Sequence, residues 1–364
     1  MITGILLISV LTALLALLLE IAYKYIANYG EVQVTINNEK TFEVTGGSPL
    51  LSTLMQQAIF LPSACGGKGT CGYCKVKIHE GGGPVMPTET PYLSTEELAQ
   101  DVRLSCQVKV KTAMQITIPD ELFNVREYRI KVDHIEQLTP LIKGLHLNIL
   151  QPEEGISFVP GQYVQLQVPP YKLSSTPEFR AYSIASSINE PKYIDLIIAR
   201  MEGGIVSGYI HDLLKEGEEL IARGPFGDFH LLTSERDILF IATGSGLAPF
   251  IAMLYQIENE NIQRKTTLIF GTKRPENLYY SDLLSGFMKR LPDFTFIPVL
   301  SRVEEQDSWT GEQGRVTDLI NRYIPDNNAV DVHICGLPIM VQSCLDILAT
   351  RGVPLEQIVY DKFE

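Results

Sequence analysis

The chain begins with one long apolar segment and continues with shorter, alternating ones. Residues 2–19 carry no charged side chain, and as a helix they would span about 27 Å, close to the ~30 Å hydrocarbon core of a bilayer. The segment leads into Glu20 and Lys24, without the basic start and small-residue cleavage site of a secretory signal. We therefore expect an uncleaved transmembrane helix within residues 1–29, with a buried core helix as the alternative. Lys24 places the rest of the chain on the cytoplasmic side.

Alternating polar and apolar residues predict a first soluble domain over residues 30–123. Two such runs on either side of a turn at Asn37 are typical of a β-hairpin. Ser48 is a candidate N-cap of the helix that follows. We expect this helix to bury four side chains: Leu51, Leu54, Met55 and Ala58. A strand over residues 75–79 and a short helix over residues 94–99 complete the domain.

Two further regions differ in the rhythm of their apolar runs. Residues 124–232 contain six short runs, which predict the strands of an antiparallel β-barrel: 128–132, 145–150, 163–168, 181–184, 194–199 and 219–222. Over residues 233–364 strands alternate with helices, as in an α/β doubly wound sheet. The predicted elements are strands 238–242, 267–270, 295–300 and 331–334, and helices 250–257, 281–291, 316–323 and 339–349.

Composition supports a multidomain globular protein. The chain has 364 residues, of which 45% are hydrophobic and 20% charged, enough for several separate cores. The net charge of -13 argues against a nucleic-acid partner, because phosphate contacts need a basic surface. Six cysteines are too few for a disulfide scaffold, and four of them lie between residues 65 and 106, which points to a metal.

These four cysteines are the strongest chemical signal in the chain. Cys65, Cys71, Cys74 and Cys106 have the spacing C-x5-C-x2-C-x31-C, and four thiolates suit a [2Fe-2S] cluster. Glycines between the ligands let the backbone turn tightly and bring N–H groups toward the sulfides. The alternative is a structural zinc site, although such sites usually pair two C-x2-C turns.

A second group of residues favours a flavin. Arg180, Tyr182 and Ser183 end a predicted strand, and Gly204 and Ser207 lie at the start of a predicted helix. An arginine and a helix N-terminus can hold a pyrophosphate, a tyrosine can lie against an isoalloxazine, and a serine can donate a hydrogen bond to a flavin nitrogen. The alternative is an ordinary strand with a surface arginine.

The third motif predicts a nucleotide turn between a strand and a helix. Gly244 and Gly246 allow a pyrophosphate to approach closely, and Pro249 preforms the first helical turn. A later string, Cys335, Gly336 and Pro338, closes a strand at the edge where open α/β sheets bind ligands. The alternatives are a turn without ligand and, for Cys335, a small core side chain.

Together the three motifs resemble known redox modules. The cysteine loop resembles that of [2Fe-2S] ferredoxins on a β-grasp fold, and the flavin and nucleotide motifs resemble the ferredoxin-NADP reductase superfamily. This resemblance implies that Ser183 and Cys335 act at the flavin and the nicotinamide, and that Phe363 stacks on the flavin. FAD, the cluster and NADH as substrate are the implied cofactors.

Over its full length the chain resembles the NADH-oxidising subunits of Na+-translocating NADH:quinone reductases. The resemblance implies electron transfer from NADH through FAD and the cluster to a membrane acceptor, quinone or partner subunits, in the inner membrane of a bacterium, in a complex that can carry Na+. One departure is the short segment between the strand at Tyr163 and Arg180, which the family has longer.

Two other functions remain open. One is the reductase component of a bacterial oxygenase, which has the same domain order but is normally soluble. The other is a membrane-tethered zinc or scaffold module without redox activity. For the choice between NADH and NADPH, the cations Lys273, Arg274 and Arg302 follow predicted strands where a 2′-phosphate would lie. Solvated loop charges are the commoner explanation for such residues, and the resemblance favours NADH.

Overall fold

The computed structural model describes residues 8–18, 29–325 and 329–362, in two compact units that divide between Val125 and Arg126. Residues 8–18 are helical, whereas the rest of the predicted transmembrane segment lies outside the described residues. No helix within the described part of the chain is both long enough and apolar enough to cross a bilayer.

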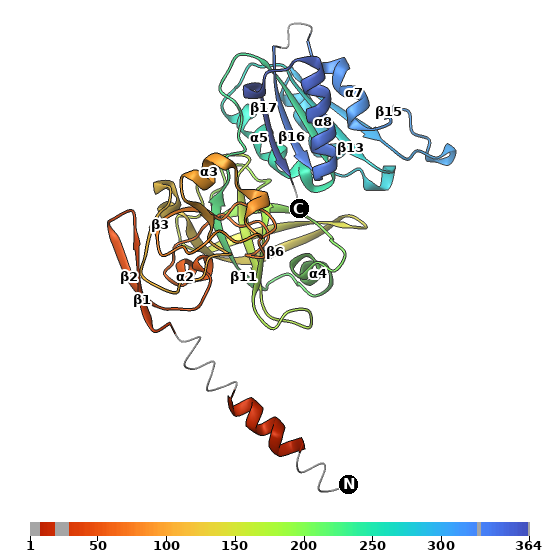
Figure 1. The fold of residues 1–364 in the computed structure, drawn as a ribbon. Coiled ribbons are helices and arrows are strands. Elements are labelled where there is room, and N and C mark those ends of the chain that lie inside the picture. Colours follow the sequence, from red (N-terminus) through yellow and green to blue (C-terminus); the bar gives the residue numbers. More distant parts are fainter. Residues whose placement is uncertain (1–7, 19–28, 326–328, 363–364) are drawn as a thin grey trace. The chain divides into compact units, whose positions relative to one another are not determined.

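The first unit contains a five-stranded mixed sheet in the order β2-β1-β5-β3-β4 (Figure 1). Its elements are β1 Glu31–Ile36, β2 Lys40–Thr45, α2 Leu50–Gln56, β3 Lys75–Glu80, α3 Thr95–Ala99, β4 Val102–Leu104 and β5 Met114–Thr117. The predicted hairpin is confirmed as β1 and β2, with Asn37 and Asn38 at positive φ in the turn. Ser94 caps α3 through a capping box, as its sequence favours.

The prediction for helix α2 was partly wrong. Pro49, not Ser48, occupies the N-cap position, and no side chain caps the helix. The buried residues are Leu50, Leu51, Thr53 and Leu54, while Met55 is half-buried and Ala58 is exposed. The helix is only two turns long and ends at Gln56, so a residue at position i+7 no longer lies on its buried face.

All six strands predicted between residues 124 and 232 are present in one antiparallel sheet, ordered β10-β7-β6-β11-β8-β9. They are β6 Arg126–Thr139, β7 Ile142–Gln151, β8 Tyr163–Val168, β9 Glu178–Ser183, β10 Tyr193–Ala199 and β11 Glu219–Phe226, with helix α4 at Ile205–Asp212. The predicted barrel is present as a half-barrel. Its two edge strands, β9 and β10, are linked by an isolated bridge between Ile184 and Leu196 instead of a continuous ladder.

The last part of the chain forms a parallel six-stranded sheet in the order β15-β14-β13-β12-β16-β17 (Figure 1). Its elements are β12 Asp237–Thr243, α5 Ala248–Asn259, β13 Thr266–Thr272, α6 Ser281–Arg290, β14 Phe294–Leu300, β15 Glu312–Gln313, α7 Val316–Tyr323, β16 Val330–Gly336, α8 Pro338–Arg351 and β17 Ile358–Lys362. The chain starts at β12, builds outward to β15 and then crosses to β16, so the order reverses between β12 and β16. This is the doubly wound arrangement, and its ligand crevice lies at that reversal.

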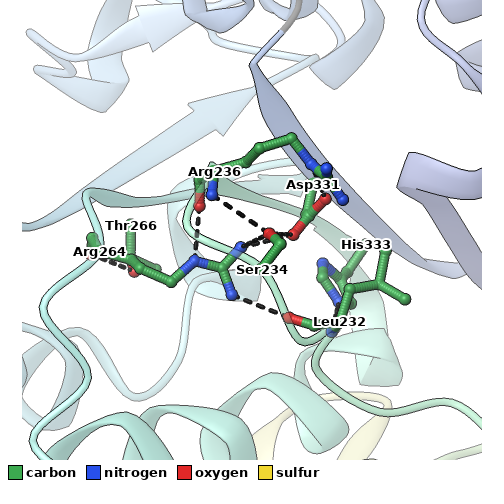
Figure 2. Close-up of polar contacts among 7 residues, drawn as sticks. All are labelled: Leu232, Ser234, Arg236, Arg264, Thr266, Asp331 and His333. Atoms are coloured by element: carbon green, nitrogen blue, oxygen red, sulfur yellow. Dashed lines mark hydrogen bonds and ion pairs between the residues drawn. The ribbon is translucent and has the colours of Figure 1, made fainter.

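A buried ionic cluster fixes the linker between the two sheets of the second unit (Figure 2). Asp331, fully buried, accepts hydrogen bonds from Arg236 and Arg264, each at 2.6 Å, and one from Ser234. Arg264 also donates to the carbonyl oxygen of Leu232 at 2.9 Å. The linker is therefore attached at the amino ends of β12, β13 and β16, opposite the edge where ligands bind.

Candidate functional site

The four cysteines form two pairs of thiols in the first unit. Cys65 and Cys71 lie with their Sγ atoms 3.4 Å apart. Cys106 follows β4, and the amide of Ser105 donates to the carbonyl oxygen of Cys74 at 2.9 Å, which holds the second pair together. Hydrogen bonds from the partner thiol lower the pKa of Cys65 and that of Cys106, the latter to about 7.

This donor set fits a cluster of two irons, each of which takes two cysteine thiolates. In the described part of the chain, the structure brings no group of three or more His, Cys, Asp or Glu side chains close enough together to hold a metal ion, so the thiols are found as two pairs. Gly69 is needed at the loop, because it has φ +77° and a Cβ there would lie 2.4 Å from Gln107 Nε2. That nitrogen is 3.5 Å from Cys106 Sγ, so the glycine lets the loop approach a ligand closely.

A buried ion pair, which no sequence motif indicated, supports the cluster loop. Arg103 and Glu89 are 5% and 0% exposed, and their closest nitrogen–oxygen distance is 2.6 Å. Glu89 also accepts the amide of Leu104 at 3.0 Å, two residues before the ligand Cys106. Burial opposes ionisation of Glu89, but the hydrogen bonds from Arg103 and two backbone amides outweigh it and lower the pKa of this carboxyl.

The predicted flavin residues come together on β9 and at the start of α4, which packs beside β8 and β9. Arg180 donates to the carbonyl oxygen of Phe179 at 2.6 Å and lies 3.5 Å from Glu178, so most of its five N–H groups can still meet a phosphate. Gly204 is the N-cap of α4 and no side chain caps the first-turn amides. Free amides and a guanidinium with spare donors suit a pyrophosphate.

The side chains of Ser207 and Tyr182 both contact other residues of the second unit. The hydroxyl of Ser207 accepts the amide of Met201 at 3.1 Å, which closes the turn before α4 and leaves its proton for a ligand. Burial raises the pKa of Tyr182, whose ring packs on the core of the half-barrel. Ser183 is 5% exposed and forms the end of β9.

The segment before Arg180, which we expect to be shorter than in the family, folds back onto helix α4. Tyr171 donates to the carbonyl oxygen of Ile205, the first residue of α4, at 2.5 Å. Its ring meets that of Tyr209 edge-on, with centroids 5.4 Å apart. The segment before Arg180 thus stabilises the position of α4 through Tyr171.

A pocket of about 720 Å³ lies at the carboxyl edge of the parallel sheet, where the strand order reverses. Its lining residues come from the strand ends and from the neighbouring half-barrel, and include Thr139, Leu141, Arg200, Met201, Thr243, Gly244, Ser245, Lys273, Ser301, Arg315, Thr317, Gly336, Leu337, Ile339, Met340 and Ser343. The buried hydroxyl of Thr243 has no hydrogen-bond partner among the described residues, so a ligand in the pocket can satisfy it. The chemistry and size suit a dinucleotide.

Two of the predicted nucleotide residues line this pocket, and the other three do not. Gly244 and Gly336 are lining residues. Gly246 is buried, and a Cβ there would lie 2.3 Å from the carbonyl oxygen of Cys335, so only glycine lets the turn and β16 approach this closely. Pro249 is buried at the start of α5, and Pro338 is the exposed first residue of α8.

Cys335 is fully buried and its thiol does not line the pocket. Burial raises its pKa well above the usual value. Asp361 pairs with Cys335 in the register of β16 and β17, and burial raises the pKa of this carboxyl to about 6. No acidic residue was predicted at this site, although the acidic–aromatic chain ending could have indicated one. Phe363 lies outside the described residues.

The three cations considered for a 2′-phosphate have different surroundings. Lys273 lines the pocket. Arg274 is ion-paired with Glu304, and Glu276 and Asp307 add further negative charge near it. Arg302 is exposed and is not a lining residue.

Three family models match successive parts of the chain. The 2Fe-2S iron-sulfur cluster binding domain matches residues 34–111. The oxidoreductase FAD-binding domain matches residues 129–231, and the oxidoreductase NAD-binding domain matches residues 240–346. Each range contains the motif that was predicted to bind the corresponding group.

The chain is also similar to curated proteins over its whole length. It is 32% identical to the F subunit of the Na(+)-translocating NADH-quinone reductase of Neisseria meningitidis serogroup C, over 405 aligned positions that cover 100% of this chain and 99% of that protein. The F subunit of the same reductase in Klebsiella pneumoniae is 31% identical over 406 positions, with the same coverage. Both alignments exceed the 364 residues of this chain, so this chain is shorter than its relatives at internal gaps.

Solved structures share the fold. The cytochrome P450 reductase GcoB of Amycolatopsis has a TM-score of 0.73 and 25% sequence identity, over 91% of this chain and 98% of that one. The ferredoxin reductase of carbazole 1,9a-dioxygenase has a TM-score of 0.70 at 22% identity, over 92% and 98% of the two chains.

Proposed function

Because the chain belongs to the family of the F subunit of the Na(+)-translocating NADH-quinone reductase, we propose that it oxidises NADH and passes the electrons through FAD and a [2Fe-2S] cluster toward quinone. The observation that carries the proposal is the presence, in one chain, of paired cluster thiols, a flavin cradle and a dinucleotide pocket. NADH gives up two electrons together and the cluster takes one, so a group that can divide the pair is required between them. FAD supplies that chemistry when bound.

The residues of this chain hold and orient the three groups. Cys65 and Cys71 would ligate one iron and Cys74 and Cys106 the other. Arg180 and the first-turn amides of α4, from the residue after its N-cap Gly204 to Ser207, would hold the FAD pyrophosphate, with Tyr182 beside the ring system and Ser183 hydrogen-bonded to it. The pocket at Gly244 and Gly336 would hold NADH, and we propose that Cys335 and Phe363 act where the two rings meet.

We also propose a role for Asp361 in stabilising the charge that forms on the nicotinamide. As NADH becomes NAD+, positive charge develops on the nicotinamide, and an ionised carboxylate nearby stabilises it. The burial of Asp361 beside Cys335 places a carboxylate at the end of β17. Hydride transfer then needs alignment of the two rings rather than a general acid or base.

We also propose the setting in which the chain works. The apolar residues 2–19 and Lys24 support a single membrane anchor within 1–29, with the soluble domains 30–123, 124–232 and 233–364 on the cytoplasmic side of a bacterial inner membrane. The names of the relatives support further subunits, quinone as acceptor and coupling to Na+ transport.

Quinone reduction by the chain within its complex tests the proposal. NADH should reduce the flavin of the purified chain, and ubiquinone should be reduced only when the chain is assembled with its membrane subunits. A chain that instead supports a soluble hydroxylase and leaves quinone oxidised would be the reductase of an oxygenase, like the ferredoxin reductase of carbazole 1,9a-dioxygenase. A colourless, zinc-containing protein would contradict both functions.

Glu304→Gln should increase the use of NADPH. The carboxylate of Glu304 forms an ion pair with Arg274 and would repel a 2′-phosphate, so its loss removes the ion-pair partner of the guanidinium and lowers the negative charge that such a group would meet. We expect kcat/KM for NADPH to rise about three- to tenfold, while that for NADH stays within about twofold. The matched control is Glu305→Gln at the exposed neighbouring residue. Unchanged NADPH kinetics would show that Glu304 does not select the nucleotide.

A further inference from the structure

Tyr279 makes a contact with the nucleotide turn that no motif indicated. It lies between the 3-10 turn Pro275–Asn277 and α6, is 4% exposed, and does not line the pocket. Its hydroxyl donates to the carbonyl oxygen of Gly244 at 2.8 Å. Its ring is held edge-on against Phe270 of β13, with centroids 5.4 Å apart and an interplanar angle of 88°. The phenol is therefore rigidly placed, with its polar end on the turn.

This hydrogen bond sets the direction of a whole peptide group. The carbonyl of Gly244 and the amide N–H of Ser245 belong to one planar trans peptide and point in opposite directions. When Tyr279 holds the carbonyl, the Ser245 N–H must point away from Tyr279. Gly244 and Ser245 both line the pocket, and burial keeps the Tyr279 phenol protonated by raising its pKa, so it stays a donor.

Glycine at position 244 makes such a restraint useful. Gly244 begins the 3-10 turn Gly244–Leu247 at φ +56°, and no atom lies within 4 Å of where its Cβ would be, so no side chain at this position limits rotation of the peptide. If the peptide turned over, the carbonyl oxygen would face the pocket in place of the N–H. An anionic pyrophosphate would then meet an acceptor instead of a donor.

We propose that Tyr279 is a positioning residue of the nucleotide site, whose hydroxyl holds the Gly244–Ser245 peptide so that the Ser245 N–H donates to the pyrophosphate of the bound dinucleotide. The inference rests on the dinucleotide site proposed above and names a residue outside its motifs. Tyr279 does not line the pocket and acts through its hydrogen bond to the turn.

Tyr279→Phe in the full-length holoprotein tests the inference. The ring and its packing are kept and only the hydroxyl is lost. The probe is ADP-ribose, which carries the pyrophosphate but no nicotinamide, with its Kd measured by calorimetry. We expect Kd for ADP-ribose and KM for NADH each to rise about five- to tenfold, with kcat at saturating NADH and FAD content within about twofold of the original chain.

Tyr280→Phe is the matched control, because Tyr280 is the half-buried neighbour and makes no hydroxyl hydrogen bond to the described residues. Its Kd for ADP-ribose should stay within about twofold. If Tyr279 had a purely structural role, Tyr279→Phe would lower the midpoint of thermal unfolding and leave Kd for ADP-ribose unchanged, and the inference would be wrong. Equal effects of Tyr279→Phe and Tyr280→Phe on Kd would also overturn it. If Tyr279→Phe is less stable, binding can still be compared through the increase in the unfolding midpoint that ADP-ribose causes in each variant. This increase should be smaller in Tyr279→Phe than in Tyr280→Phe. If NADH failed to reduce the flavin of the wild-type protein, that result would count against the proposed function instead.

Discussion

Cys74→Ser should abolish the iron-sulfur cluster and with it electron transfer beyond the flavin. Cys74 is 1% exposed and paired with Cys106, and a serine hydroxyl is a much weaker ligand for iron than a thiolate. We expect bound iron and sulfide to fall from about two each per chain to background, and quinone reduction in the complex to fall below about 1%. Reduction of the flavin by NADH should stay within about twofold, because the other motifs lie in the second unit.

The control for this variant is Cys344→Ser, which makes the same change at a fully buried cysteine in helix α8. It should retain its iron and sulfide, although loss of packing can lower its stability. Full iron content in Cys74→Ser, or cluster loss in both variants, would refute the assignment of the cluster to Cys65, Cys71, Cys74 and Cys106.

Asp331→Asn should be the most destabilising conservative change in the second unit. The substitution keeps the size of the side chain but leaves the buried guanidinium of Arg264 without its carboxylate (Figure 2). Removing one partner of a buried ion pair typically costs about 3–5 kcal/mol. In a unit of this size we expect the midpoint of thermal unfolding to fall by roughly 10 °C, measured by calorimetry on the holoprotein.

Glu235→Gln removes the same charge from an exposed residue of the same linker and should change the unfolding free energy by less than about 0.5 kcal/mol. If Asp331→Asn cost no more than this control, the buried cluster would not be what holds the linker to the parallel sheet.

Much of the architecture could be predicted because it depends on local patterns. Alternating residues predicted the hairpin at Asn37 and all six strands of the half-barrel, and apolar strands followed by amphipathic helices predicted the doubly wound sheet. The elements that were missed are short or lack an apolar run. β15 has only two residues, Glu312 and Gln313, and β17 carries Asp361 and Lys362 at its end.

The supporting contacts of the sites could not be predicted, because they join residues that are distant in the sequence. Arg264 and Asp331 are separated by 67 positions, and Tyr279 and Gly244 by 35. No periodicity or spacing links such pairs. From the sequence alone, a charged residue such as Asp331 is expected at the surface, not in the core. The ligands were easier to find, since the chemistry of iron and pyrophosphate requires particular residues close together in the chain.

An anaerobic titration of the purified chain with NADH, followed by visible and electron paramagnetic resonance spectroscopy, tests the central proposal most directly. FAD takes two electrons and the cluster one, so about 1.5 NADH per chain should bleach the flavin and produce the signal of one reduced [2Fe-2S] centre. A flavin that bleaches with one NADH while the cluster stays oxidised, or a protein that lacks either group, would contradict the relay from NADH to the cluster.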